Sequence, residues 1–138
     1  MRHTLAIIKP NAVASGHTGK ILSKLESSGF SLVAMRFLQL TIEDAEKFYG
    51  IHKERPFFDS LITFMTSGPV VPMVLEREDA VLKFREVIGA TDPTDAKEGT
   101  IRNLYGESLE RNTIHGSDSD ENARIEIDFF FRDFFERS

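Results

Sequence analysis

Strand-like and helix-like segments alternate along this chain in an order that few folds can accommodate. A short apolar run that ends at Pro10 is typical of a buried strand, and the later segments show the apolar spacing of either strands or helices. The expected order is strand, helix, strand, two helices, strand, helix, strand and helix, over residues 4–9, 19–28, 30–40, from 41, 57–65, 70–75, 79–88, 112–115 and from 117. This order predicts an α+β protein with a ferredoxin-like βαββαβ sandwich, in which helices cover one face of a four-stranded antiparallel sheet. Because the chain has no repeat, low-complexity segment or Pro/Gly-rich linker, residues 1–138 are expected to form a single domain.

Two of the predicted strands carry features that constrain their neighbours. Residues 30–40 place apolar side chains on both alternating faces, so this strand is expected to be covered on both sides, with a second subunit as one candidate cover. Pro72 lacks the N–H that a ladder hydrogen bond requires. The strand over 70–75 is therefore predicted to lie at an edge or to contain a bulge.

Three segments in the second half of the chain have distinct patterns. Residues 90–111 are polar and show little periodicity, and long segments of this kind often carry function. Ser117, followed three residues later by Asp120, is predicted to cap the last helix. Near the end of the chain, apolar residues fall on one helical stripe, which favours packing in the core or against another subunit; they are Ile127, Phe130, Phe131 and Phe134.

Composition and motifs argue against several classes of function. The formal net charge of −5 predicts no general attraction to nucleic acid or to anionic membranes. The absence of cysteine excludes thiolate chemistry and disulfides, and the four histidines are too scattered for a zinc-binding pair. A P-loop match fails at Ala14 and Ile21. The first residues lack the features of a signal peptide, and no apolar run approaches the roughly 20 residues that span a bilayer.

Residues 112–119 are the best candidate for a reactive site. His115 is followed by Gly116, which lets a backbone approach a ligand closely, and then by the predicted start of a helix, where an anion is favoured. A neutral imidazole nitrogen is a competent nucleophile. These residues therefore suggest a histidine that meets a phosphate. They are also compatible with a plain helix cap beside a half-buried histidine, and local features alone leave both interpretations open.

Six segments together resemble one family. The motif Asn-x-x-His-Gly-Ser-Asp-Ser at 112–119 is the signature of nucleoside diphosphate kinases, and the chain resembles the short bacterial members of this family over nearly its whole length. The other five segments occur in the family's order and spacing: Ile8–Pro10, Arg55–Phe58, Met65–Val71, Gly89–Pro93 and Gly99–Arg102. One departure is Asn11-Ala12, where many relatives have Asp-Gly, and this change is not expected to affect the chemistry.

The resemblance implies a role for each matching residue. His115 would be the nucleophile and would carry the γ-phosphoryl group as a pros-phosphohistidine. Glu126, supported by Ser117, would bond the far imidazole nitrogen, and a carboxylate there fixes the tautomer and offsets charge on the ring. Tyr49 would line the histidine pocket, and Phe57 would stack on the base. The residues that would hold phosphates and sugar hydroxyls are Lys9, Arg85, Thr91, Arg102 and Asn112. Taken singly, each of these residues also has an ordinary structural explanation.

The resemblance further implies ping-pong transfer from a nucleoside triphosphate, typically ATP, to a nucleoside diphosphate. Because stacking distinguishes bases poorly, ATP, GTP, CTP, UTP and their deoxy forms are all expected as substrates. Mg²⁺ would arrive with the nucleotide phosphates rather than in a protein metal site. A cytoplasmic homo-oligomer built from dimers, either a tetramer or a hexamer, is expected. The alternatives are a histidine phosphocarrier, which needs only the nucleophile, and a non-catalytic nucleotide-binding module.

Overall fold

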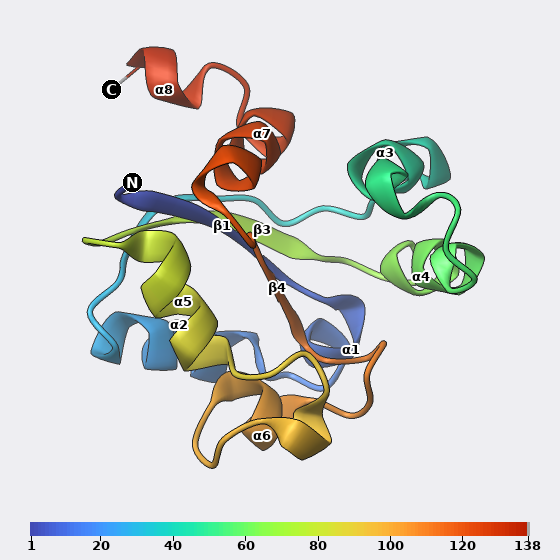
Figure 1. Cartoon of the computed structure of the whole chain (residues 1–138), viewed down its shortest axis with the longest axis horizontal. Helices are drawn as coiled ribbons and strands as arrows, with labels where there is room; N and C mark the ends of the chain where they lie inside the picture. Colours follow the sequence, from blue (N-terminus) through green and yellow to red (C-terminus); the bar gives the residue numbers. More distant parts are fainter. Residues whose placement is uncertain (138) are drawn as a thin grey trace.

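The structure, a computed structural model, describes residues 1–137 and contains one four-stranded antiparallel sheet (Figure 1). Its strands are β1 (His3–Ile8), β2 (Ser31–Met35), β3 (Val71–Glu76) and β4 (Ile114–Gly116). The α-helices are α1 (Pro10–Ala14), α2 (Thr18–Ser27), α3 (Ile42–Phe48), α4 (Phe58–Met65), α5 (Ala80–Ile88), α6 (Ile101–Tyr105), α7 (Asp120–Phe130) and α8 (Phe134–Arg137). Two 3₁₀ helices are η1 (Gly50–His52) and η2 (Pro93–Asp95). Within residues 1–137, no helix is long and apolar enough to cross a membrane.

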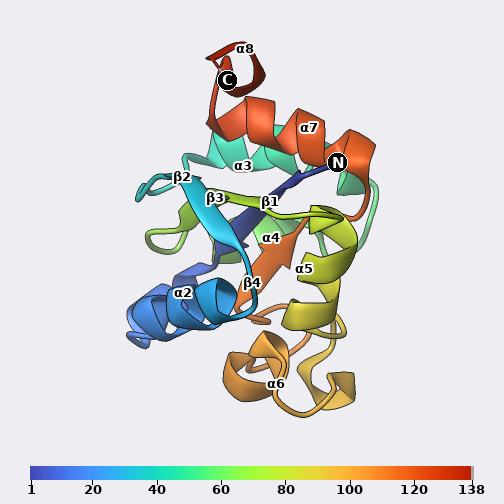
Figure 2. The same cartoon turned by 90° about the vertical axis from the view of Figure 1, so that its left-hand side faces the viewer.

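The strand order is β2-β3-β1-β4, so the ferredoxin-like architecture is confirmed. The expectation that helices cover one face only is wrong. Helices α2 and α5 cover one face, while α7 and the α3–α4 pair cover the other (Figures 1 and 2). The physical reason lies in β1, where Leu5 and Ile7 point into one core and Ala6 and Ile8 point into the other. A strand that is apolar on both alternating faces needs a cover on each side.

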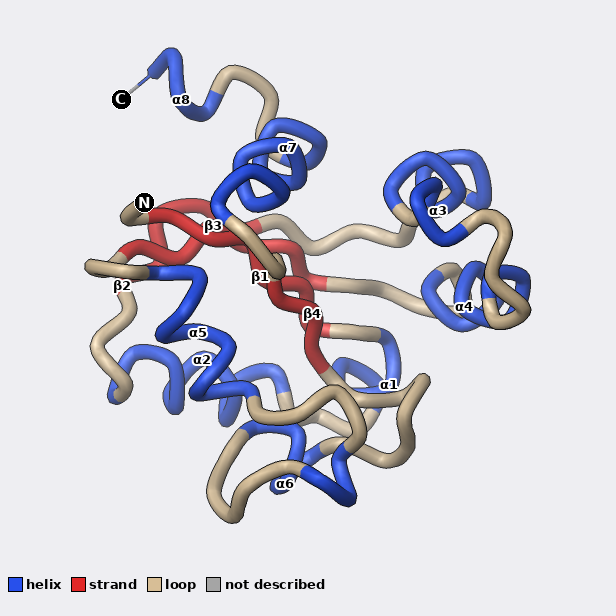
Figure 3. The backbone as a smooth tube through the Cα atoms, in the orientation of Figure 1, coloured by secondary structure: helices blue, strands red, loops and turns tan. Residues whose placement is uncertain are grey.

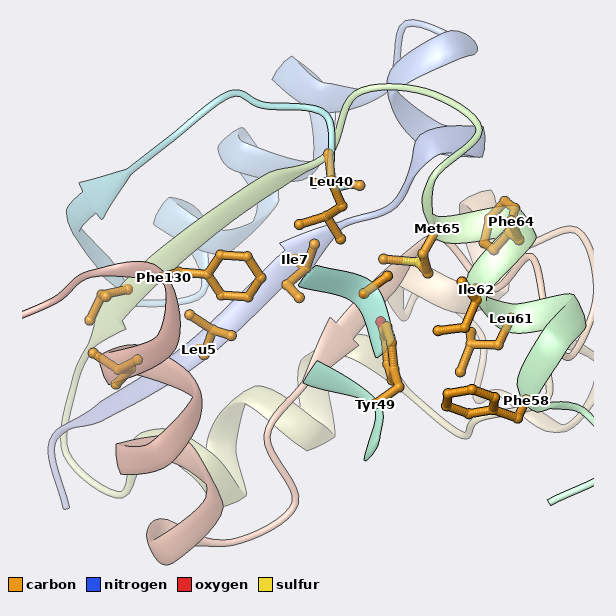
Figure 4. Packing of buried hydrophobic residues seen from close by; sticks show 14 residues of the cluster. Leu5, Ile7, Leu40, Tyr49, Phe58, Leu61, Ile62, Phe64, Met65 and Phe130 are labelled. Atoms are coloured by element: carbon orange, nitrogen blue, oxygen red, sulfur yellow. The ribbon is translucent and has the colours of Figure 1, made fainter. Parts of the chain in front are cut away.

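The core that contains Leu5 and Ile7 positions the functional site. Figure 4 shows this cluster, in which side chains from α4 and Phe130 of α7 surround the β1 residues and Tyr49. Tyr49 directly follows α3, whose N-cap Thr41 accepts a hydrogen bond from the backbone N–H of Asp44 at 3.1 Å. The predicted helix that starts at Thr41 is therefore confirmed, and it places Tyr49 against the sheet.

Strand β3 is an inner strand, so the prediction that Pro72 marks an edge is wrong. The register shift lies in β2, between Leu32 and Ala34, and not at Pro72. The Pro72 carbonyl accepts from the backbone N–H of Arg36 at 3.0 Å. Since the N and C=O of one residue face the same neighbour in an antiparallel ladder, the ring nitrogen also faces the β2 side, just beyond the end of that strand at Met35. The ladder between β1 and β3 is therefore intact.

Strand β2 is one of the two edge strands, and one of its faces is open. Its side chains alternate between exposed and half-buried, and Val33, Met35 and the following Phe37 are 41%, 54% and 69% exposed. Within one chain, the predicted cover on both sides is therefore found on one side only.

The helix predicted to start at Ser117 begins later than expected. Helix α7 starts at Asp120, and its cap is Ser119, whose Oγ accepts from the backbone N–H of Asn122 at 3.1 Å. The prediction that Ser117 caps this helix is wrong. The predicted apolar stripe does pack in the core: Ile127 and Phe130 are buried, and partly buried apolar residues that follow pack against them. The helix itself ends at Phe130, before the short helix α8.

The chain from α5 to β4 is mostly loop (Figure 3). Two short helices that the sequence pattern did not predict, η2 and α6, interrupt it. Gly89 ends α5 with φ 89°, a left-handed conformation that glycine adopts without strain, and this confirms the predicted helix stop. Within this segment, Arg102 of α6 bonds the Ile114 carbonyl of β4, and the Thr91 carbonyl accepts from Asn112, just before β4.

Candidate active site

His115 lies in β4 opposite Ile7 of β1, and its ring is partly buried. Its Nε2 atom is 2.8 Å from Oε1 of Glu126, which projects from α7. A carboxylate only accepts hydrogen bonds, so Nε2 carries the proton and Nδ1 keeps its lone pair. The hydroxyl of Ser117 donates to the same Oε1 atom at 2.7 Å and fixes the carboxylate. The late start of α7 frees Ser117 for this contact.

Two aromatic rings surround the imidazole. Phe48 lies edge-on to His115 with ring centroids 5.4 Å apart, and the Tyr49 ring lies 6.5 Å away at 89°. The Tyr49 hydroxyl is buried, and within residues 1–137 it has no hydrogen-bond partner. Burial, and then the charge of Glu126, raise the pKa of this hydroxyl, so it stays protonated at neutral pH. Tyr49 thus offers a donor beside the imidazole.

Gly116 has a different role from the one expected. A Cβ atom at this position would lie 2.8 Å from the ring of Phe84 and 3.0 Å from the side chain of Ile88. Both residues belong to α5. The glycine is therefore required for close packing of α5 against β4, and no approach of a ligand is needed to explain it.

Lys9 lies between β1 and α1, as the N-cap residue of α1, and its side chain is buried. Nζ donates to Oδ1 of Asn112 at 2.8 Å, and Nδ2 of Asn112 donates to the Thr91 carbonyl at 2.9 Å. Burial, and then the charge of Arg102, lower the pKa of Lys9 to about 7, although Glu110 acts in the opposite direction. Within residues 1–137, no carboxylate lies within ion-pair distance of Lys9.

Arg102, in α6, is a second buried cation without a carboxylate partner in the described part of the chain. Its guanidinium donates to the carbonyls of Gly89 at 3.0 Å and Ile114 at 2.8 Å, while Nε has no partner among residues 1–137. Burial, and then the charge of the exposed Arg85, lower the pKa of Arg102 to about 10. Buried cations without counter-ions are costly, so this region is suited to an anion.

Two cavities adjoin these residues, and Thr91 borders both. The first, which we call the Phe57 cavity, has a volume of about 530 Å³ and is lined by Lys9, Phe57, Leu61, Thr91, Ser108, Leu109, Glu110 and Asn112. The second, the Arg102 cavity, has a volume of about 550 Å³, and Arg85, Thr91 and Arg102 are in its wall. His115 lines neither cavity, but its neighbours in the chain bond residues of both: Ile114 accepts from Arg102, and Asn112 bonds Lys9 and Thr91.

The structure thus places every candidate site residue in one of three groups, and Thr91 belongs to two of them. These groups are the His115–Glu126–Ser117 triad with Tyr49, the Phe57 cavity and the Arg102 cavity. Sequence reasoning missed Phe48, which touches the imidazole, and Leu61 and Leu109, which share the Phe57 cavity. Spacing gives no signal for contacts between residues so far apart in the chain. The only hint is that Phe48 directly precedes Tyr49.

Comparisons with known proteins agree on one family. A family model described as nucleoside diphosphate kinase matches residues 2–135. The chain is 59% identical over 132 residues to a nucleoside diphosphate kinase of Campylobacter jejuni, with 96% of each chain covered, and 59% identical over 131 residues to one of Nitratiruptor, with 95% and 96% covered. Among solved structures, the nucleoside diphosphate kinase of Aquifex aeolicus has a TM-score of 0.92 at 46% identity, with 94% of each chain covered. The enzyme of Halobacterium salinarum, solved in complex with CDP, has a TM-score of 0.91 at 43% identity, with 95% of this chain and 88% of that chain covered.

Proposed function

The chain belongs to the nucleoside diphosphate kinase family, and from this premise we propose that His115 carries the phosphoryl group between nucleotides. The family's enzymes are phosphotransferases that act on nucleoside triphosphates and diphosphates. The observation that carries the assignment is the pairing of Nε2 with Glu126. This pairing leaves Nδ1 as the nucleophile. Two buried cations without a carboxylate partner within residues 1–137 bond residues shortly before His115: Lys9 bonds Asn112 and Arg102 bonds Ile114.

The reaction consists of two displacements. In the first, the Nδ1 lone pair forms a bond to the γ-phosphorus while the bond from that phosphorus to the β–γ bridging oxygen breaks, and the nucleoside diphosphate leaves. In the second, a terminal oxygen of another nucleoside diphosphate attacks the phosphorus and the P–N bond breaks. The same residues serve both steps, since the second is the chemical reverse of the first.

Three side chains act on the imidazole and on the phosphoryl group that it carries: Glu126, Ser117 and Tyr49. When Nδ1 forms the P–N bond, positive charge develops on the ring, and the Glu126 carboxylate at 2.8 Å from Nε2 offsets it. The Ser117 hydroxyl keeps that carboxylate in place. Tyr49 offers its buried hydroxyl, which has no hydrogen-bond partner in the described chain, as a donor to the transferred group.

The two cavities divide the nucleotide between them. Phe57 stacks on the base, with Leu109 in the same cavity, while Lys9 and Asn112 bind the sugar hydroxyls and nearby phosphate. Arg85, Thr91 and Arg102 hold the phosphates, where phosphoryl transfer requires positioning and neutralisation of charge. A solved relative that binds CDP supports this use of the fold. Contact through one aromatic face predicts that many bases are accepted.

We propose that a divalent cation, Mg²⁺, accompanies the nucleotide. This ion prefers phosphate oxygens and water to cages made only of protein ligands. Within residues 1–137, no group of three or more His, Cys, Asp or Glu side chains could hold a metal ion. Each step above is assigned to a side chain.

We also propose that the protein works in the cytoplasm as a homo-oligomer built from dimers. The open face of β2 supports the dimer, because Met35 and Phe37 expose apolar surface at the edge of the sheet. Sedimentation of the protein and of a Phe37→Lys variant tests this proposal. A monomeric parent protein, or a variant with the parent's assembly size, would count against it.

The experiment that tests the reaction is phosphoryl labelling. The protein incubated with γ-labelled ATP should acquire an acid-labile label that ADP, GDP or CDP removes. His115→Ala should acquire none, whereas the matched control His17→Ala should be labelled like the parent. Label that persists in His115→Ala refutes the assignment. Label on His115 that resists nucleoside diphosphates favours the phosphocarrier alternative instead.

A further inference from the structure

Asn11 lies in the first turn of α1, two residues after Lys9, and is only 6% exposed. Its Nδ2 atom faces three acceptors: Oε2 of Glu107 at 2.9 Å, the carbonyl of Arg111 at 3.1 Å and Oγ1 of Thr113 at 3.5 Å. One side chain therefore ties α1 to both ends of the segment that leads into β4.

Asn112 is held between two of these contacts. Its neighbours on either side, Arg111 and Thr113, both face the Asn11 amide, and the backbone N–H of Lys9 donates to the Thr113 carbonyl at 2.8 Å. Thr113 has φ 81°, a left-handed conformation that a β-branched residue adopts only when its surroundings impose it. The contacts of Asn11 are among those surroundings. The bond from Lys9 Nζ to Asn112 Oδ1 depends on the same alignment.

The chemistry at this position requires a donor. The Glu107 carboxylate and the Arg111 carbonyl only accept hydrogen bonds, so the amide must present its NH₂ group to them. The other amide atom, Oδ1, is buried and has no partner within residues 1–137. A carboxylate at position 11 would place an acceptor and a negative charge against Glu107.

We propose that Asn11 is a positioning residue for nucleotide binding, which aligns Asn112 with Lys9 in the wall of the Phe57 cavity. This inference rests on the proposed function and differs from the sequence-based expectation that Asn11 has no bearing on the chemistry. Asn11 itself lines neither cavity and acts through Asn112. Two charged groups belong to this network of hydrogen bonds: Glu107, in the loop before β4, bonds Asn11, and Lys9, before α1, bonds Asn112.

The test is the affinity for ADP with Mg²⁺, measured by calorimetry. Asn11→Asp should raise Kd by about tenfold at pH 8, because an unpaired buried acceptor faces a like charge. Lowering the pH to 5.5 should bring the ratio of variant to parent Kd back toward one, since a proton shared by the two carboxylates restores a donor. Asn11→Asp combined with Glu107→Gln should recover most of the affinity at pH 8. Glu107→Gln alone is the matched control and should bind like the parent, because Gln also offers an acceptor.

Two results would overturn the proposal. One is a parent-like Kd for Asn11→Asp throughout the pH range. The other is a loss of affinity that neither low pH nor Glu107→Gln reverses, since a purely structural defect would behave in that way. If Asn11→Asp does not fold, Asn11→Ala should raise Kd about threefold above the parent's, and this ratio should not depend on pH. A parent-like Kd for Asn11→Ala would then overturn the proposal. Failure of His115 labelling would refute the proposed reaction separately, because ADP affinity does not require turnover.

Discussion

Lys9 should make nucleotide binding depend on pH, because its buried ammonium group is only partly protonated in the free protein. Burial, then Arg102, hold its pKa at about 7, opposed by Glu110. At pH 8, roughly one Lys9 in ten therefore carries a charge. Phosphate groups bound near Nζ favour the charged form and raise this pKa. Binding at pH 8 should therefore take up close to one proton per site.

The sign and size of the effect follow from these two protonation states. Well below pH 7, Lys9 is already charged before binding, so its contribution to affinity is complete; at pH 7 about half of it is charged. Above pH 7, a proton must be acquired on binding, and affinity should fall by up to about tenfold per pH unit until the pKa of the complex is reached. Between pH 7 and 9, the expected loss is roughly fifty-fold if Lys9 remains charged in the complex.

The assay is calorimetric titration with ADP and Mg²⁺ at pH 6 and 8, in buffers with different ionisation enthalpies. The dependence of the observed heat on the buffer gives the number of protons taken up. Lys9→Met is the matched control, because it fills similar space without a titratable group. Equal proton uptake by the parent and Lys9→Met at pH 8 would refute the reasoning.

Folding stability should respond to the same group. The folded protein holds the pKa of Lys9 below its ordinary value of 10.5, so between pH 7 and 10.5 the unfolded chain binds more protons. The contribution of Lys9 to the free energy of unfolding should therefore increase with pH in this window. Urea denaturation of the parent and Lys9→Met, compared across the window, measures this contribution.

Four further substitutions test other residues in and around the site. Glu126→Gln should slow phosphoenzyme formation by about 10- to 100-fold, because it removes the charge from a hydrogen bond worth roughly 1.5–3 kcal/mol; rapid-quench labelling measures the rate, and a parent-like rate would contradict the role of Glu126. Gly116→Ala should lower the free energy of unfolding by about 1–3 kcal/mol, because its Cβ would press on Phe84; an unchanged urea midpoint would show that α5 adjusts without cost. Ser119→Ala should cost about 1 kcal/mol of stability but leave turnover intact, whereas Ser117→Ala should slow turnover; the reverse pattern would mean that the two serines have been assigned the wrong roles.

The fold was largely predictable because its signals are local. The apolar runs of β1 and β3, the Thr41 cap and the Gly89 stop each depend on a few adjacent residues. The edge position predicted from Pro72 is wrong because the sequence shows that its N–H is missing but not which neighbouring strand the ring nitrogen faces. Short helices such as α6 were missed because five residues show too little periodicity to be recognised.

The choice between Ser117 and Ser119 shows where local rules stop. Both are serines before acidic residues, and each is compatible with an N-cap. A contact that is remote in sequence decides between them: Ser117 bonds Glu126, more than one turn into α7. This bond requires a short connecting segment between the end of β4 at Gly116 and the start of the helix. The cap therefore passes to Ser119. Because Ser117 does not cap the helix, its hydroxyl is available to hold the Glu126 carboxylate that bonds the imidazole.

The candidate site could be located from the sequence through a family motif, but the burial and pKa values of its cations could not be predicted. Lysine and arginine are usually exposed, so nothing in the residues around Lys9 or Arg102 predicts that both cations are buried without a carboxylate within residues 1–137. The folded chain bears that cost in the free state, which lowers both pKa values. In the proposed reaction, a bound polyphosphate supplies the missing negative charge. The energy that destabilises the free site is thereby recovered on binding, which explains how a chain with a net charge of −5 can still bind an anionic substrate.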